Sequence, residues 1–186
     1  MDIITTENLA KHFGALQAVK GVSFQVAEGE IFGFLGPNGA GKTTTINMLC
    51  TLLKPTAGRA TVNGYDVATQ RSQVRHSIGL VFQESTLDDY LTAEQNLRFH
   101  AYAYAVPKEI REPRLKELLD LVELWDRRKG RISTYSGGMK RRLEIARGLL
   151  HHPKVLFLDE PTLGLDPQTR RTIWAHIREL RQRENL

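Results

Sequence analysis

Short runs of apolar and β-branched residues predict strands in the first half of the chain. Residues 3–10 and 19–27 are expected to form antiparallel strands, and residues 59–67 a strand, a turn and a second strand. Two more continuously apolar runs, 30–36 and 78–83, are expected to be buried strands. The pattern therefore predicts a strand-rich region before residue 90.

Helical periodicity dominates the second half. A helix is expected over residues 41–53, ending where Pro55 and its neighbours interrupt the pattern. Residues 91–150 are almost wholly helical in pattern, residues 155–160 return to a buried strand, and residues 167–185 predict a last helix.

The order of these elements predicts the domain organisation. A strand-rich core that is interrupted by helices and then resumed is an α/β nucleotide-binding layout. The prediction is a single domain over residues 1–186, with the core in 1–90 and 151–186 and an inserted helical subdomain in 91–150.

Composition narrows the class of protein. Hydrophobic residues make up 41% and charged residues 25% of the chain, as in soluble globular proteins. The apolar runs are too short to span a bilayer, and the N-terminus has no signal-like segment, so a cytosolic chain is expected. The single cysteine, Cys50, is expected to be a small core residue.

The net charge is +5, and the basic residues are concentrated in clusters at 127–131, 140–142 and 178–183. Such clusters could bind nucleic acid or anionic lipid. The alternative, which the interleaved Glu and Leu residues favour, is that they are solvated faces of helices.

A glycine-rich loop lies between a predicted strand and a predicted helix. GPNGAGKTT, residues 36–44, fits the pattern G-x-x-x-x-G-K-[ST] in the context that a phosphate-binding loop requires. Lys42 is expected along the β- and γ-phosphates, Thr43 on Mg²⁺, and Thr44 on the α-phosphate. The alternative is a glycine turn with an incidental lysine. The nucleotide-binding prediction covers Gly36, Pro37, Asn38, Gly39, Ala40, Gly41, Lys42, Thr43 and Thr44.

Two carboxylates end the strand predicted over VLFLDE. Successive residues of a strand point to opposite sides, so Asp159 can face a metal ion while Glu160 faces the water that attacks the γ-phosphate. The alternative is an acidic cap that keeps a hydrophobic strand soluble. The phosphate loop elsewhere in the chain favours catalysis.

A second phosphate-binding device is predicted at YSGGM, residues 135–139. Ser136 is a helix N-cap, and Gly137 and Gly138 leave their N–H groups open toward an anion at the helix N-terminus. The alternative is a helix cap alone. One domain does not need two such devices in one site, but an interface between two domains could use both.

Several motifs occur together in one order, and this series carries a family resemblance. GPNGAGKTT, then Gln83, YSGGM with KRRLEIARGLL, VLFLDEP, and GLD at 164–166 together resemble the ATPase subunit of ATP-binding cassette (ABC) transporters. The resemblance runs from about Ile4 to the last residue, and YSGGMKRRLEIARGLL is similar to the branch that serves drug-resistance and polysaccharide exporters. It implies a RecA-like P-loop NTPase core, with ATP and Mg²⁺ as cofactors.

The resemblance implies roles for further residues. Two cassettes pair head to tail, so that Tyr135, Ser136, Gly137, Gly138 and Met139 of one meet the γ-phosphate held by the other. Phe13 resembles the aromatic residue that stacks on adenine, and Gln83 the glutamine that senses Mg²⁺ and the attacking water. Asp166 resembles an aspartate at the dimer interface; an N-cap before Pro167 is compatible with that role.

The chain departs from the family at its C-terminus. Family members continue with a strand and a histidine that contacts the γ-phosphate, whereas this sequence ends at Leu186. A truncated cassette with weak turnover is therefore expected, and the alternative function is a nucleotide-binding fragment. His176 lies within the last predicted helix and is expected at the surface or an interface, not in place of the missing histidine.

The resemblance also implies the partners. These are a second cassette and a separate integral membrane permease, contacted around residues 84–97, which would hold the chain at the cytoplasmic face of the membrane. A DNA-repair or translation cassette is disfavoured, because the helical insertion is compact, lacks a cysteine cluster and occurs once. The chain is therefore predicted to be an exporter ATPase without a nucleic-acid partner, whose substrate is chosen by the permease.

Overall fold

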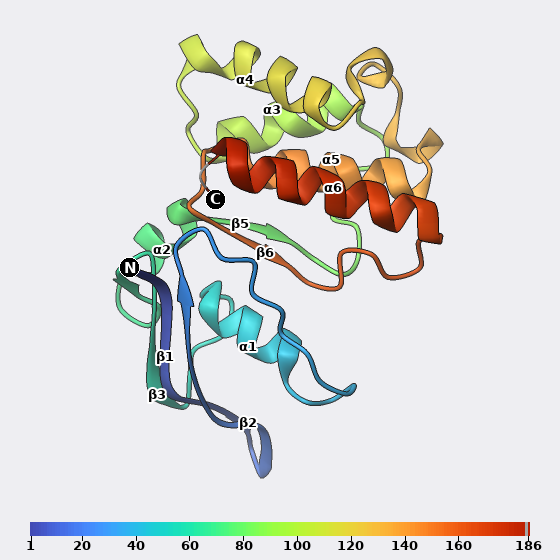
Figure 1. Ribbon diagram of the computed structural model, residues 1–186. Helices are drawn as coiled ribbons and strands as arrows, with labels where there is room; N and C mark the ends of the chain where they lie inside the picture. The colour runs from blue at the N-terminus through green and yellow to red at the C-terminus, as the bar shows by residue number, and fades with distance from the viewer. Residues whose placement is uncertain (185) are drawn as a thin grey trace. The chain divides into compact units, whose positions relative to one another are not determined.

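The computed structural model describes residues 1–184 and 186 of the chain. These residues form two compact units, one of Met1–Ile78 with Leu186 and one that begins at Gly79 (Figure 1). The predicted boundaries of the helical subdomain, at 90/91 and 150/151, remain a prediction about the domain as a whole.

The first unit is built on an antiparallel sheet with the strand order β2-β1-β3-β4. Ile4 on the central strand β1 pairs with Val26 on one side and Val62 on the other, and all three side chains are buried. The predicted antiparallel strands and the strand–turn–strand at 59–67 are thus confirmed. The elements of this unit are β1 (Asp2–Phe13), β2 (Leu16–Ala27), α1 (Lys42–Leu49), β3 (Ala57–Val62), β4 (Tyr65–Asp66) and α2 (Arg71–Ser77).

The predicted buried strand at residues 30–36 is not formed. This segment has no strand geometry, and the exposed fractions of Ile31, Phe32 and Leu35 are 45%, 42% and 93%. A strand needs neighbours for its backbone N–H and C=O groups, and none of the strand pairings within the described residues includes this segment. Ring contacts hold it instead, with Phe32 stacked on Phe24 at 5.2 Å between centroids.

The second unit contains the helices predicted over residues 91–150 and 167–185 and a sheet of two neighbouring strands, β5 and β6. Its helix α3 begins at a full capping box, in which Thr92 and Gln95 satisfy each other's backbone N–H groups. The helical character of residues 91–150 and the last helix are confirmed, although Asn185, the predicted end of that helix, lies outside the described residues. The elements are β5 (Ile78–Val81), α3 (Ala93–Ala103), α4 (Lys108–Leu121), the 3-10 turns Trp125–Arg127 and Ile132–Thr134, α5 (Gly137–Gly148), β6 (Val155–Leu158) and α6 (Pro167–Glu184).

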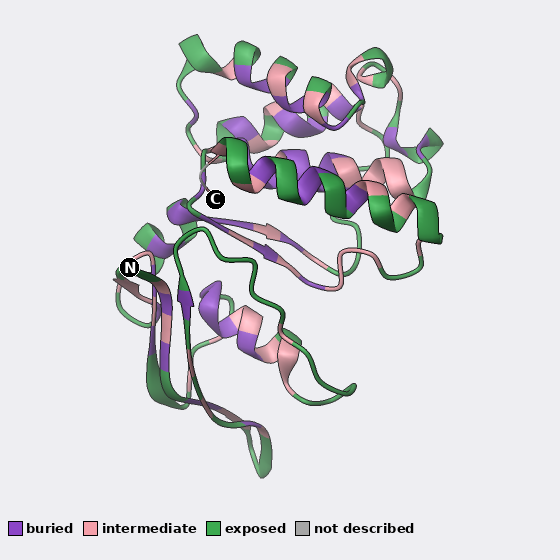
Figure 2. Ribbon diagram, in the orientation of Figure 1, coloured by how far each residue is buried: buried purple, intermediate pink, exposed green. Residues whose placement is uncertain are grey.

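Two glycines let helix α5 approach the strands closely. A Cβ on Gly79 of β5 would lie 2.3 Å from the carbonyl oxygen of Gly148, and a Cβ on Gly148 would lie 3.3 Å from Leu156 of β6. No side chain fits in the first of these gaps, so the backbones of α5 and β5 are in direct contact. In helix α5 the buried residues are Arg141, Leu143, Glu144, Ile145, Ala146 and Gly148 (Figure 2).

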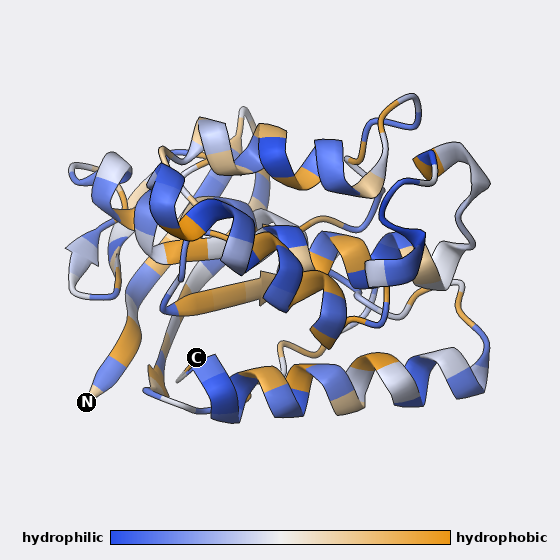
Figure 3. Ribbon diagram, turned by 90° about the horizontal axis from the view of Figure 1, so that it is seen from above, coloured by the Kyte–Doolittle hydropathy of each residue, from blue (hydrophilic) through white to orange (hydrophobic). Residues whose placement is uncertain are grey.

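Helix α6 is amphipathic, and hydrophobic and hydrophilic residues recur in turn along its ribbon (Figure 3). Its buried face is formed by Ile173, His176, Ile177 and Leu180. The expectation of a surface or interface position for His176 is therefore wrong: its exposed fraction is 8%, because it shares the helix face of two isoleucines and a leucine. Among the described residues, no helix is both long enough and apolar enough to span a membrane.

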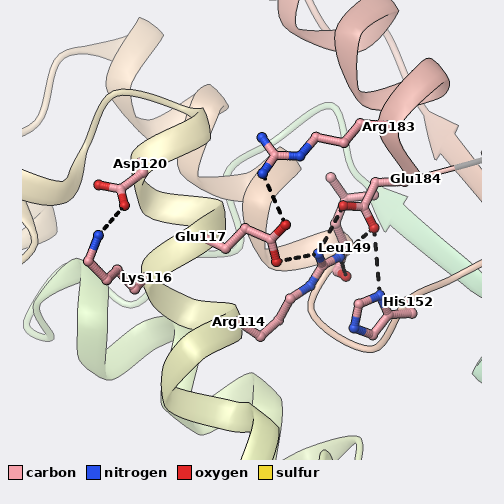
Figure 4. A network of polar contacts seen from close by, with 8 residues as sticks. All are labelled: Arg114, Lys116, Glu117, Asp120, Leu149, His152, Arg183 and Glu184. Carbon is pink, nitrogen blue, oxygen red and sulfur yellow. Dashed lines mark hydrogen bonds and ion pairs between the residues drawn. The ribbon is translucent and has the colours of Figure 1, made fainter.

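A network of ion pairs joins the end of α6 to α4 and to the turn after α5 (Figure 4). The guanidinium of Arg114, which is buried, donates to both carboxylate oxygens of Glu184 at 2.9 and 2.7 Å and to the carbonyl oxygen of Leu149 at 2.9 Å. It also donates to Glu117 at 3.0 Å, which in turn accepts from Arg183 at 3.2 Å. The last turn of α6 is thereby fixed to the other helices of its unit.

Replacing Glu184 by Gln is expected to lower the free energy of unfolding by about 2 kcal/mol at pH 7, because Arg114 loses its main counter-charge. Burial alone would raise the pKa of Glu184, but the hydrogen bonds and charge of Arg114 outweigh it, so the pKa lies below its ordinary value of 4.5. The stabilisation is therefore complete above the unfolded-state pKa and is lost as the pH falls through the lower folded-state pKa. Urea unfolding at neutral and acidic pH measures the free energy of unfolding. The difference in this free energy between wild type and Glu184→Gln should shrink on acidification.

The matched control is Asp120→Asn in the exposed Lys116–Asp120 pair of α4. Exposed pairs contribute at most about 1 kcal/mol, so this variant should lose less stability than Glu184→Gln. Equal losses for the two variants would contradict a special role for the buried pair.

Candidate functional site

The glycine-rich loop of the first unit closes on itself before helix α1. Gly41, the N-cap of α1, has left-handed backbone angles of φ 87° and ψ 13°, and a Cβ there would lie 2.5 Å from the carbonyl oxygen of Ala18. Only glycine meets both demands. The Lys42 ammonium lies across the loop and donates to the carbonyl oxygens of Gly36 at 2.8 Å and Pro37 at 3.1 Å.

The start of α1 favours an anion. Its first turn carries no acidic residue and no side-chain cap, so its N–H groups and its dipole face the loop. The buried Thr45 anchors this turn, since its hydroxyl donates to the carbonyl oxygen of Gly41 at 2.9 Å. Thr43 is exposed on the same turn, and the loop residues 36–40 are exposed.

Phe13 lies at the end of the β1–β2 hairpin, where it pairs with Leu16. Its side chain is 46% exposed, and the ammonium of Lys11 lies 5.1 Å from the ring centroid. Gly41 contacts Ala18, only two residues from Leu16, so the closing end of the loop and the Phe13 ring belong to the same end of the hairpin.

In the second unit, the ends of β5 and β6 meet. The N–H of Asp159 donates to the carbonyl oxygen of Val81 at 3.0 Å, which places Gln83 and Glu160, each two residues beyond its strand, at one edge. Asp159 is buried, with a 6% exposed fraction, while Glu160 is half-buried and Gln83 is exposed. Glu160 has a left-handed φ of 47°, which turns the chain sharply after Asp159.

The YSGGM segment forms the predicted N-cap of α5. The Ser136 hydroxyl oxygen accepts from the N–H of Met139 at 3.3 Å, with Ser136 and Gly137 exposed and Gly138 half-buried. Tyr135 is buried and its hydroxyl donates to the carbonyl oxygen of Arg127 at 2.8 Å; burial raises its pKa. The tyrosine thus holds the segment from inside the unit, while the helix N-terminus faces outward.

Asp166 caps helix α6, as the sequence predicts. One carboxylate oxygen accepts from the N–H groups of Gln168 and Thr169, each at 3.0 Å, and the other from the Thr169 hydroxyl. Hydrogen bonds from Thr169 lower the pKa of this exposed carboxyl. A Cβ on Gly138 would lie 2.7 Å from the Thr169 methyl carbon, so the N-terminal ends of α5 and α6 are adjacent.

Two charged residues of α5 join this site without having been predicted. Arg141 and Glu144 are 7% and 3% exposed and form an ion pair at 3.1 Å. The expectation that the basic cluster at 140–142 is a solvated helix face is therefore wrong for Arg141. The available signal was its i, i+3 pairing with Glu144 on the helix face that also carries Ile145.

The oxygen donors of the predicted metal site suit Mg²⁺. They are the hydroxyl of Thr43, the amide oxygen of Gln83 and the carboxylate of Asp159, all hard ligands. Within residues 1–184 and 186, no group of three or more His, Cys, Asp and Glu side chains is arranged to hold a metal ion.

Known proteins match this chain across both units. The family model described as "ABC transporter" matches residues 19–163. The linearmycin resistance ATP-binding protein LnrL of Bacillus subtilis is 42% identical over 180 residues, which cover 97% of this chain and 58% of that protein. The doxorubicin resistance ATP-binding protein DrrA of Mycobacterium tuberculosis is 48% identical over 161 residues, 87% of this chain and 49% of that protein. The chain thus spans about half the length of these curated relatives.

Solved structures share the fold. CbiO1 of Clostridium perfringens, part of the transporter complex cbiONQ, superposes with a TM-score of 0.90 at 30% identity, over 99% of this chain and 75% of that one. A dimeric ATP-binding cassette in a post-hydrolysis state, bound to ADP and Pi, superposes with a TM-score of 0.84 at 30% identity, over 98% and 84% of the two chains. The predicted α/β class, a P-loop core with N-terminal antiparallel strands and inserted helices, is confirmed.

Proposed function

We propose that this chain, which belongs to the ABC transporter family, is the ATP-binding and ATP-hydrolysing subunit of an exporter that acts through a separate membrane permease. The observation that carries the proposal is the glycine-rich loop. Its left-handed Gly41, its lysine folded over the loop carbonyls and its uncapped helix N-terminus are the parts that cradle a phosphate chain. In this proposal Phe13 stacks on the adenine, and its exposure at the same end of the hairpin supports that role.

On nucleotide binding, Lys42 exchanges its contacts with the carbonyl oxygens of Gly36 and Pro37 for the β- and γ-phosphates. The backbone N–H groups of residues 38–44 face the phosphates, and Thr44 lies near the α-phosphate. Thr43, Gln83 and Asp159 would hold Mg²⁺, and the ion would supply positive charge against the phosphate oxygens.

Glu160 is the general base of the proposed hydrolysis. It accepts a proton from the water that attacks the γ-phosphate, and Gln83, from the neighbouring strand end, orients that water. Both side chains follow strands joined by the Asp159–Val81 hydrogen bond, which supports their acting on one water molecule.

The N-terminus of α5 acts on a second copy of the cassette, in which Tyr135–Met139 of one chain meet the γ-phosphate bound by the other. The exposed Ser136 and Gly137 support this role, since they leave the N-terminus of α5 accessible to an anion. Asp166, exposed beside them at the start of α6, belongs to the same interface.

The proposed exporter role follows the relatives, two of which are named for resistance to linearmycin and doxorubicin. The permease binds around residues 84–97, chooses the substrate and holds the chain at the cytoplasmic face of the membrane. No nucleic-acid partner is proposed.

ATP turnover measured against protein concentration tests the proposal, with Lys42→Ala as the blank. The rate per chain is expected to rise with concentration, because each site needs a segment of the second copy. Turnover above the blank with a constant rate per chain would contradict the paired site. ATP binding without turnover would instead support the alternative, a nucleotide-binding segment that hydrolyses little.

A further inference from the structure

A buried charged pair in helix α5 holds the backbone on which the proposed catalytic groups are carried. We propose that Arg141 and Glu144 are positioning residues, which fix the chain around Gln83 and Glu160 and couple it to helix α5. That the two residues position catalytic groups rests on the proposed function. That they hold the backbone in place does not depend on it.

The guanidinium of Arg141 donates hydrogen bonds to three consecutive backbone carbonyl oxygens after β6. Its Nη2 donates to Asp159 at 3.1 Å and Glu160 at 3.0 Å, and its Nε donates to Pro161 at 2.8 Å. The turn that it holds includes the left-handed Glu160, a conformation that non-glycine residues rarely adopt without support. One buried side chain therefore determines the path of the chain at the proposed general base.

The same pair holds the segment around Gln83 on both sides. Arg141 Nη1 donates to the carbonyl oxygen of Phe82 at 2.5 Å and to Glu144 Oε2 at 3.1 Å. The other oxygen of Glu144 accepts from the N–H of Thr86 at 3.0 Å. Residues 83–85 thus form a short loop fastened to α5 immediately before and after it.

The contacts use every donor of the arginine. A guanidinium has five N–H groups, and Arg141 places them on four backbone carbonyls and one carboxylate. A lysine in its place has three donors on one nitrogen and cannot reach carbonyls on both strand ends at once. The position therefore requires arginine rather than a positive charge.

We call Arg141 and Glu144, with their bonds to residues 82, 86 and 159–161, the clamp. It connects the N-terminus of α5, which is proposed to meet a second cassette, to the backbone beside Glu160 and Gln83. The helix is capped by Ser136, which faces a second cassette in the proposed function, and Arg141 follows little more than one turn later. A shift of the helix when its N-terminus meets a bound nucleotide is therefore passed to the carbonyls beside Glu160 and Gln83. The partner cassette would in this way adjust the catalytic groups of the chain that it contacts.

Hydrogen exchange of the chain without nucleotide tests the clamp independently of catalysis. Arg141→Lys is expected to raise amide exchange in residues 82–87 and 159–163 by about tenfold or more, since these segments lose their common anchor. The control is Arg142→Lys on the same helix, whose contacts go to Val122 and Glu123 instead, and which should leave both segments unchanged. Unchanged exchange in Arg141→Lys would overturn the inference.

ATP turnover tests the positioning role. Arg141→Lys should lower kcat roughly 10- to 100-fold while KM for ATP changes by less than about threefold, because the phosphate loop is untouched. Raised exchange with wild-type kcat would overturn the positioning role, and equal kcat losses in the two lysine variants would do the same. If wild type shows no turnover, the proposed function fails, and the exchange result still decides whether the clamp exists.

A second variant covers the case in which Arg141→Lys does not fold. Glu144→Gln keeps the shape of the side chain and an acceptor for Thr86, but removes the charge that faces Arg141. It should raise exchange in residues 82–87, and protection equal to that of wild type would contradict the clamp.

Discussion

Replacing Glu160 by Gln is expected to reduce ATP hydrolysis roughly 10²- to 10⁴-fold, the usual contribution of a general base. The amide has the size of the carboxylate but cannot accept a proton from the attacking water. ATP binding should be unchanged, because Gly41 and Lys42 form the nucleotide loop without any contribution from this side chain. Single-turnover phosphate release and equilibrium ATP binding measure the two effects separately.

The matched control is Glu179→Gln, an exposed carboxylate on α6, which should leave the rate unchanged. Because the variant binds ATP without consuming it, its ATP-bound dimer should also persist longer in gel filtration than that of wild type. A rate for Glu160→Gln within about threefold of wild type would show that another group takes the proton.

Replacing Gly137 by Asp is expected to abolish turnover while leaving the chain folded. A Cβ at this position would meet only Leu165, at an ordinary contact distance of 3.6 Å. The helix dipole also stabilises a carboxylate in the first turn of α5. Facing the γ-phosphate of a second copy, however, the same carboxylate adds like charge. A repulsion of several kcal/mol corresponds to a loss of at least about 100-fold in rate.

Mixing distinguishes action on the partner from action within one chain. Gly137→Asp keeps an intact phosphate loop, and Lys42→Ala keeps an intact α5 N-terminus, so a mixed dimer contains one complete site. An equal mixture should recover up to about a quarter of the wild-type turnover, although neither variant hydrolyses ATP alone. Gly137→Asn, which adds the shape without the charge, should lose less activity. A mixture as inactive as its components would contradict the paired site.

Features that depend on local order were predictable from the sequence. The phosphate loop was recognisable because glycine spacing, a lysine and a following helix are all fixed within residues 36–44. The N-caps at Ser136 and Asp166 followed from side-chain hydrogen bonds that span two or three residues, and the structure has both. The periodicity of the helices in residues 91–150 was equally visible, since it reflects one buried face per helix.

Features that depend on distant neighbours were not predictable in this way. Residues 30–36 have the composition of a buried strand, yet no strand in the described part of the chain pairs with them, and Leu35 is 93% exposed. His176 belongs to a polar-looking helix but is buried, because the apolar residues on its face turn it inward.

The sequence by itself determined the glycine-rich loop, the two helix caps and the helices of residues 91–150, because each depends on contacts within a few residues. Only the tertiary structure decided that Arg141 is buried, since its carbonyl partners come from residues 82 and 159–161. It also decided that Gly79 must remain small, because Gly148, far along the chain, lies against it. A buried charge and a close backbone approach are set by what surrounds a residue in space, which the neighbouring letters of a sequence do not specify.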